Sequence, residues 1–312
     1  MAAINLAHLR RALALRGLTP ASAVPEASGG RTEEACVRPA RLVEDAALEW
    51  HPVGTPEPWP GTLAFLDGVQ RSELLAYAGA APIVVGEVAA GVRERSNRKL
   101  VTVLEERRLL ILARAAALAA AGELPEAFRT VALPADEPPH PVRDLANAGR
   151  ALDRARGALE LELGEGYRRR SEGWLVVDGA LTESPRWAAD PRMLGVSKSH
   201  ATLPFEGENL DRYLRLPPGH RSSVYAPETR SLTPVSEWAL RLWPWEGKDV
   251  FYGLVRIEVA PANGSPEIAD RLSRWLLAER APLSTPDHRW DRLLYGIHSV
   301  ESYLRAGGRR LA

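Results

Sequence analysis

Cysteine, long apolar runs and a secretory leader are all missing or scarce in this chain, and each absence excludes a class of protein. Cys36 is the only cysteine, so the chain can form no internal disulfide and no cysteine-cluster zinc or iron–sulfur site. No apolar run reaches about 18 residues, the length that a membrane-spanning helix needs. The first 17 residues are amphipathic and rich in arginine, without the apolar core of a secretory signal. We therefore expect a cytoplasmic protein with no membrane partner.

The motifs of several well-known catalytic sites are also absent. No Walker-type loop or GxGxxG follows an expected strand, so we expect no P-loop or Rossmann nucleotide site. There is no GxSxG elbow, and the seven histidines include no HExxH pair. Charge is equally uninformative, because 40 Lys and Arg balance 40 Asp and Glu. Nearly all the basic residues are arginine, which suits phosphate binding but is explained as well by a GC-rich coding bias.

What the chain does contain is two apolar runs that each lead into Asp-Gly. Residues 62–66 precede Asp67, and residues 174–177 precede Asp178. Each run is typical of a buried strand that delivers a carboxylate at its C-terminal end, where ligand sites form in open α/β sheets. Two such carboxylates suit a divalent metal such as magnesium or manganese. The alternative is that each Asp-Gly is simply a hairpin turn.

A third carboxylate is available on the helix expected at 142–167, which leads into the Asp178 strand. The helix presents a leucine face toward the core, and Glu160 and Glu162 flank this face on opposite sides. Either glutamate can lean over the edge of the sheet and join the aspartates. A solvated surface position is the alternative for each.

Three further side chains are candidates for chemistry at neutral pH. His298, on the expected last helix, is able to bind a metal or act as a general acid or base, but a surface or core position is the alternative. Lys198 and His200 close the strand expected at 192–199 and are placed to contact a phosphate.

Periodicity and turn signals predict an α/β fold with a mixed sheet, because strands come first as a meander and then alternate with helices. We expect a helix at 4–17, then a connector over 18–32 that is rich in proline, glycine, alanine and serine. Residues 1–47 are assigned to this N-terminal helix and flexible connector, and 48–312 to the main domain. The expected strands are 62–67, 72–79, 82–92, 174–178, 192–199, 235–243 and 250–259, and the expected helices after the first are 100–121, 142–167, 206–213, 265–280 and 289–306.

Taken in order, several motifs resemble those of NurA-type nucleases, particularly the bacterial branch of that family. The stretches that carry the resemblance are 65–73 around Asp67, 156–160 ending in Glu160, 176–181 around Asp178, 194–200, 252–258 and 294–301. They extend over residues 60–306. No single motif is specific, and their order and spacing carry the resemblance.

The resemblance implies an RNase H-like mixed sheet flanked by helices and a divalent-metal-dependent nuclease with two ions, manganese or magnesium. Carried over by position, the catalytic and metal-binding residues are Asp67, Glu160, Asp178 and His298, with Glu162 as the rival to Glu160. Arg71, which follows the first aspartate, is a candidate DNA contact together with Lys198 and His200.

The resemblance also implies a substrate and partners. It points to a 5′–3′ exonuclease on single- and double-stranded DNA ends, with single-strand endonuclease activity. Such an enzyme acts as a homodimer in double-strand-break resection with a HerA-type hexameric translocase. Two alternatives stay open: a catalytically silent DNA-binding subunit of a translocase complex, or an RNase H-like nuclease for RNA or branched DNA.

Overall fold

The structure is a computed structural model that describes residues 6–20, 36–96, 99–228, 233–244, 250–281 and 292–308. Most of the expected connector lies outside these residues, as does the first part of the helix expected at 289–306. The helices are α1 Leu6–Ala14, α2 Ala115–Ala121, α3 Pro141–Arg168, α4 Pro185–Ala189, α5 Gly207–Leu214, α6 Pro266–Glu279 and α7 Tyr295–Gly307, with 3₁₀ turns η1 Leu181–Glu183 and η2 Pro261–Asn263. The strands are β1 Thr19–Pro20, β2 Cys36–Val37, β3 Ala40–Leu42, β4 Trp50–Pro52, β5 Leu63–Ala78, β6 Ala81–Ser96, β7 Lys99–Arg114, β8 Phe128–Leu133, β9 Trp174–Asp178, β10 Met193–Ser197, β11 Thr202–Leu203, β12 His220–Ser222, β13 Tyr225–Pro227, β14 Ser236–Arg241 and β15 Leu254–Val259.

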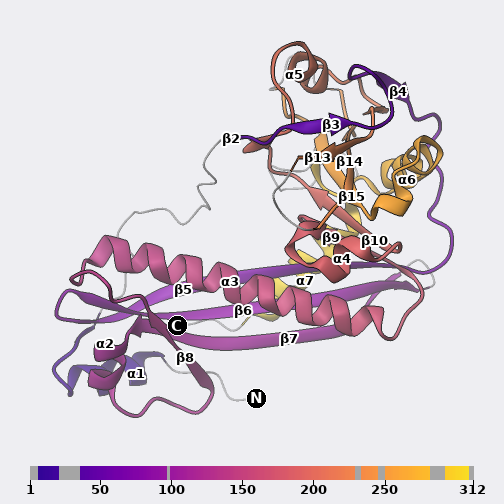
Figure 1. Cartoon of the computed structure of the whole chain (residues 1–312). Helices are drawn as coiled ribbons and strands as arrows, with labels where there is room; N and C mark the ends of the chain where they lie inside the picture. The colour runs from indigo at the N-terminus through magenta and orange to yellow at the C-terminus, as the bar shows by residue number, and fades with distance from the viewer. Residues whose placement is uncertain are drawn as a thin grey trace.

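A single mixed sheet connects almost all of these strands (Figure 1). Its central order is β15-β10-β9-β5-β6-β7. Strands β5, β6 and β7 form an antiparallel meander, β9 joins β5 in parallel, and β10 joins β9 in parallel. Helices cover both faces. The α/β fold with a mixed sheet flanked by helices, predicted from the sequence, is therefore confirmed.

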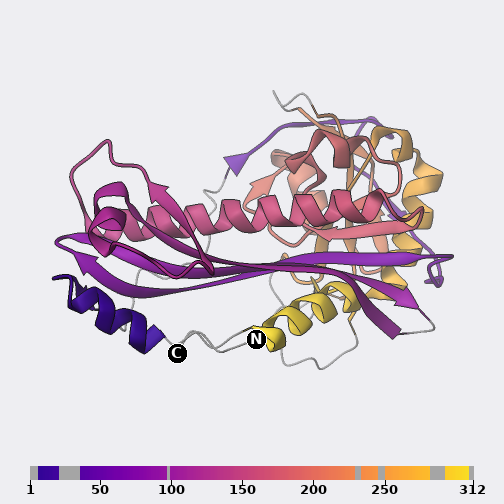
Figure 2. The ribbon, with the colours of Figure 1, turned by 90° about the horizontal axis from the view of Figure 1, so that it is seen from below.

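The two faces of the sheet are covered by different helices. Figure 2 shows α3 running along one face, with α1 and α7 on the other. Leu152, Leu159 and Leu163 of α3 are buried in the core on the first face, as the leucine periodicity predicted. On the second face, α7 packs mainly on β5 and β6, and α6 shares an apolar core with β9, β10, β14 and β15. The cleft described below lies where β9 ends between these two layers.

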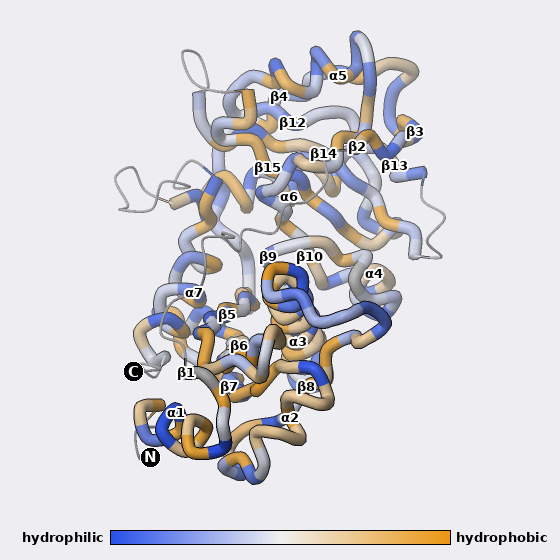
Figure 3. The backbone as a smooth tube through the Cα atoms, turned by 90° about the vertical axis from the view of Figure 1, so that its left-hand side faces the viewer, coloured by the Kyte–Doolittle hydropathy of each residue, from blue (hydrophilic) through white to orange (hydrophobic). Residues whose placement is uncertain are grey.

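The N-terminal segments belong to the same body. Helix α1 buries its leucines in a core shared with α2, β5, β6, β7 and β8, and Figure 3 shows these apolar stretches meeting at one end of the molecule. The short strands β3 and β4 pair with β13 and β12, so residues 40–52 extend the sheet rather than linking separate parts.

Two sequence predictions about the meander are wrong. Residues 100–114 were expected to begin a long helix, but they form β7, and only Ala115–Ala121 are helical. The expected break at Val69 and Gln70 is absent, because β5 runs unbroken from Leu63 to Ala78. Asp67 therefore lies in the interior of a long strand, neither at a strand end nor in a hairpin turn.

The remaining expected elements are present with small shifts at their ends. The strands expected at 192–199 and 235–243 appear as β10 and β14, while the strand expected at 250–259 begins later, at Leu254 in β15. The helices expected at 142–167, 206–213 and 265–280 appear as α3, α5 and α6. In the part of the chain that the structure describes, no helix is long and apolar enough to cross a bilayer.

Candidate functional site

A large cleft of about 1800 Å³ opens between α3 and the strands β5, β9, β10 and β15. One wall is made by α3 over most of its length, from Val142 to Leu161. The charged side chains along the cleft include Arg71, Arg150, Arg154, Arg156, Lys198, Arg256, Asp67, Asp153, Glu160, Asp178, Glu237, Glu258 and Glu301. The cleft therefore combines a cluster of carboxylates with a rim of arginines, a combination that suits a polyanion held around a cation site.

The sheet places the two expected aspartates side by side. Leu66 of β5 is opposite Val177 of β9, so the next residues, Asp67 and Asp178, are neighbours where β9 ends. Asp67 is 6% exposed. Burial raises its pKa well above the usual range, and the negative charges of Asp178, Glu160 and Glu301 raise it further. Burial and the three neighbouring carboxylates therefore both disfavour the ionised form of Asp67.

Glu160, and not Glu162, reaches these aspartates. The Glu160 side chain lies over Gly68, where an added Cβ would come within 3.0 Å of its Cγ and Cδ atoms and closer still to Oε1. It also pairs with Arg156 one turn earlier on α3. Glu162 points elsewhere: its side chain is 56% exposed and pairs with Arg108 of β7 at 2.6 Å. Of these two glutamates, Glu160 is therefore the one that lines the cleft beside the aspartates.

Helix α7 contributes a carboxylate that sequence reasoning missed. Glu301 is 8% exposed, lines the cleft and acts electrostatically on Asp67. Its Oε1 accepts hydrogen bonds from Arg305 Nη2 at 2.8 Å and Nε at 3.1 Å. The available signal was its position: Glu301 lies on the same helical face as Ile297 and Leu304, which pack against the sheet. An acidic residue on the apolar face of a helix is costly unless it has a partner or a role.

The expected histidine, His298, lies one turn before Glu301 on α7. It is not among the described residues that line the cleft. Its Nε2 is 3.4 Å from Ser302 Oγ, and its Nδ1 is buried with no hydrogen-bond partner among the described residues. A role for His298 at the site stays a prediction.

Two of the three expected DNA contacts line the cleft. Lys198 Nζ lies 2.8 Å from Asp178 Oδ2, so its positive charge is already inside the carboxylate cluster. Arg71 pairs with Glu87 at 2.5 Å and faces the same cleft.

The third expected contact, His200, is enclosed by protein. Its ring stacks on Phe251 with centroids 5.0 Å apart, and its Nε2 lies 3.0 Å from the Leu254 carbonyl oxygen. Burial lowers its pKa to about 4, so the ring is neutral at pH 7. We therefore remove His200 from the expected phosphate contacts, because it does not line the cleft and carries no charge.

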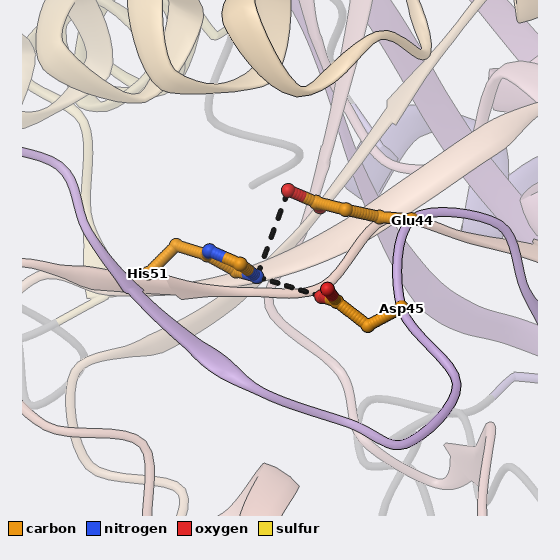
Figure 4. Close-up of side chains that lie close together, drawn as sticks. All are labelled: Glu44, Asp45 and His51. Carbon is orange, nitrogen blue, oxygen red and sulfur yellow. Dashed lines mark hydrogen bonds and ion pairs between the residues drawn. The ribbon is translucent and has the colours of Figure 1, made fainter.

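A second group of possible metal ligands is outside the residues that line the cleft (Figure 4). It consists of Glu44 and Asp45, between β3 and β4, and His51 on β4. His51 Nε2 is 2.8 Å from Asp45 Oδ2 and 3.6 Å from Glu44 Oε1. However, the buried guanidinium of Arg221 donates to both Glu44 oxygens, at 2.7 and 2.9 Å, and also to Asp270. With the Glu44 charge already compensated, these residues form an ion-pair network that holds the 44–51 segment against β12.

The carboxylates in the cleft have the donor chemistry of a divalent-metal site, although among the described residues only Glu44, Asp45 and His51 have ligand atoms that all lie within 4.8 Å of one another. The cleft carboxylates offer oxygen atoms only, from four side chains, and oxygen is the donor that magnesium and manganese prefer. Burial raises the pKa of Asp67 most, and repulsion from the charges of Asp178, Glu160 and Glu301 raises it further, while Lys198 lowers it. A bound cation removes that repulsion. Asp67, Glu160, Asp178 and Glu301 are therefore the residues that would hold it.

Comparison with known proteins places this geometry in a structural context. No protein-family model matches the sequence, and no curated protein matches it either. Among solved structures, the chain is similar to the NurA nuclease from Sulfolobus solfataricus, with a TM-score of 0.53 at 10% identity over 82% of this chain and 81% of that one. Human ENDOV also matches, at 15% identity over 97% of both chains, but with a TM-score of only 0.33. The chain therefore has a NurA-like fold, as its sequence motifs predicted.

Proposed function

We propose that this protein is a divalent-metal-dependent deoxyribonuclease that hydrolyses phosphodiester bonds in the cleft between α3 and β9. The observation that carries the proposal is that Asp67, Asp178, Glu160 and Glu301 line one cleft together with several arginines, and that Asp67 is buried near the other three carboxylates. The fold of the known nuclease supports it. In this proposal the nuclease domain spans residues 48–312.

The metal requirement follows from the chemistry of the reaction. Two bound divalent ions, manganese or magnesium, supply an activated water molecule and neutralise the charge that develops on the leaving oxygen. Asp67, which is more buried than Asp178, and Asp178 itself form the centre of the ligand set. Glu160 approaches from the α3 side and Glu301 from α7.

The cations of the cleft position the substrate. Lys198 Nζ lies 2.8 Å from Asp178, which places it to contact a phosphate oxygen of a strand held at the site. Arg71, on the same strand as Asp67, is placed to hold the adjacent phosphate of the DNA backbone. The role of His298, one turn before Glu301 on α7, rests on the resemblance alone: it would complete the metal shell or protonate the leaving 3′-oxygen, and either role requires its side chain to turn toward the cleft.

The finer parts of the proposal rest on the resemblance to NurA-type nucleases. They are 5′–3′ exonuclease action on single- and double-stranded ends, endonuclease action on single strands, and a homodimer that works with a HerA-type hexameric translocase in end resection. Manganese is the favoured ion.

Glu160 and Glu162, both on α3, offer a matched test. Glu160→Gln removes one charge from the cluster with little change in shape, and we expect it to lower kcat for manganese-dependent DNA cleavage by about a hundredfold or more. Glu162→Gln makes the same change two residues away, where the side chain pairs with Arg108 outside the cleft, and we expect it to keep the wild-type rate. Equal rates for both variants would refute the assignment of Glu160, and activity in EDTA would refute the metal requirement.

A further inference from the structure

The turn that follows Asp178 is fastened from a neighbouring strand by a buried glutamate. Glu258 of β15 is 2% exposed, and its Oε2 accepts a hydrogen bond from the Leu181 backbone N–H at 2.8 Å. Leu181 begins the 3₁₀ turn η1, three residues after the aspartate. The Glu258 side chain therefore fixes the backbone path of the turn that follows β9.

The same turn is packed closely against β10. Gly195 has no side chain at the point where a Cβ would lie 2.7 Å from the Gly179 carbonyl oxygen and 3.3 Å from the Leu181 nitrogen. Gly179 itself has a φ of 131°, a conformation that L side chains rarely adopt. Its N–H donates to the Val196 carbonyl at 3.0 Å. Three separate features, on β10, on β15 and in the turn, therefore hold one backbone path.

Burying a carboxylate needs compensation, and Arg256 provides it. Its Nη2 lies 3.6 Å from Glu258 Oε1, and its Nε lies 3.5 Å from Glu237 Oε2 on the next strand. Glu237 and Glu258 are directly opposite each other in the sheet and share this arginine. They differ in one respect that matters here: Glu258 has the hydrogen bond to the turn after Asp178.

We propose that Glu258 is a positioning residue for the metal centre, acting through the Leu181 N–H to fix the Asp178 carboxylate, while Glu237 has no part in holding that turn. This inference rests on the proposed metal-dependent nuclease function. Groups that orient a metal ligand without touching the metal typically contribute about 10- to 100-fold in metal affinity. Glu258 does so through the backbone of the ligand's own turn.

The test measures manganese binding directly, by electron paramagnetic resonance titration of free manganese in the full-length protein. Glu258→Leu removes the acceptor, and we expect manganese affinity to fall by about tenfold or more. Glu258→Gln keeps an oxygen that can accept the Leu181 N–H, and we expect affinity within about threefold of wild type. Glu237→Leu is the matched control: it also leaves Arg256 with one carboxylate fewer, but we expect manganese affinity to be unchanged.

Breaking the same hydrogen bond from its other end guards against a folding defect in Glu258→Leu. Leu181→Pro deletes the N–H, leaves the Glu258–Arg256 pair in place and occupies the first position of a helical turn, which proline tolerates. The preceding Ala180 is already extended, at φ −88° and ψ 142°, as a residue before proline must be. We expect the same loss of manganese affinity, with thermal melting used to confirm that each variant is folded.

The outcomes separate this inference from the proposed function. Wild-type manganese affinity in folded Glu258→Leu or folded Leu181→Pro overturns the positioning role, and so does an equal loss in Glu237→Leu. If Asp178→Asn loses manganese while those two variants retain it, the metal centre stands and only the role of Glu258 falls. If wild type binds no manganese, or Asp178→Asn binds it as well as wild type does, both proposals fail.

Discussion

A single methyl group added at Gly68 should lower activity by displacing the Glu160 side chain. A Cβ on Gly68 would lie within 3.0 Å of two carbon atoms of Glu160 and nearer still to its Oε1. Ordinary contacts between such atoms begin at about 3.5 Å, so the carboxylate must withdraw by on the order of 1 Å. Misplacement of a reacting group by about 1 Å costs about a hundredfold in rate. We therefore expect Gly68→Ala to lower kcat for DNA cleavage by about a hundredfold.

The assay is manganese-dependent cleavage of a labelled oligonucleotide under saturating DNA. Gly166→Ala is the control, because it makes the same change on the helix that carries Glu160, where the nearest atoms to an added Cβ are 3.8 Å away. We expect this control to keep the wild-type rate. A folded Gly68→Ala protein that cleaves within about threefold of wild type would show that Glu160 does not need its observed position, and would refute the reasoning.

Two further predictions concern stability. Asp144 is fully buried and accepts hydrogen bonds from Arg114 Nε and Nη2 at 2.7 and 2.9 Å. Because Asp144→Asn leaves a buried guanidinium without its counter-charge, it should lower the free energy of unfolding in urea by about 3–5 kcal/mol. A loss below about 1 kcal/mol would contradict this prediction. The pKa of His200 is lowered to about 4 from 6.5 by burial, so between these pH values the unfolded chain binds more protons and stability rises with pH. The protonation of His200 should therefore lower the free energy of unfolding of the wild type by about 2–3 kcal/mol between pH 6.5 and pH 4.5. The variant His200→Phe, which keeps the stacking on Phe251, should lack this contribution. Equal pH dependence in the two proteins would show that His200 is not the group responsible.

Three of the carboxylates named from the sequence, Asp67, Glu160 and Asp178, line one cleft, but the element that carries Asp67 differs from the expected one. Asp178 lies at the end of β9 as expected, because four apolar residues and a glycine mark a short buried strand and its turn. Asp67 meets it for a different reason: β5 continues past the point where β9 ends, and the parallel register brings the two aspartates together. Register between strands more than a hundred residues apart is a tertiary property that no local pattern encodes.

The misassigned β7 illustrates the same limit. Its stretch of Glu105, Glu106, Arg107 and Arg108, followed by leucines and alanines, has a high intrinsic preference for helix. Pairing with β6 along almost the whole of both strands overrides that preference. The β-branched residues Val101, Thr102 and Val103 at its start were the local signal for a strand.

Glu301 and Glu258 were missed because each depends on a partner distant in sequence. Glu301 reaches the cleft because α7 packs across β5, and Glu258 reaches the Leu181 N–H because β15 pairs with β10. Glu160 differs from Glu162 because its side chain lies over Gly68 of β5, a contact that the helix sequence does not reveal. Glu160 and Glu162 point in directions about half a helical turn apart, and the position of β5 beneath α3 decides which of them faces the aspartates.

The most direct test of the metal-dependent nuclease is cleavage of end-labelled single-stranded and duplex DNA by wild type and Asp178→Asn, with manganese, magnesium or EDTA. We expect wild type to degrade DNA with manganese and to be inactive in EDTA, and Asp178→Asn to lose activity while remaining folded. Retained cleavage by Asp178→Asn would contradict the placement of the site. Absence of cleavage by pure wild type, persisting after a HerA-type translocase is added, would contradict the nuclease function itself.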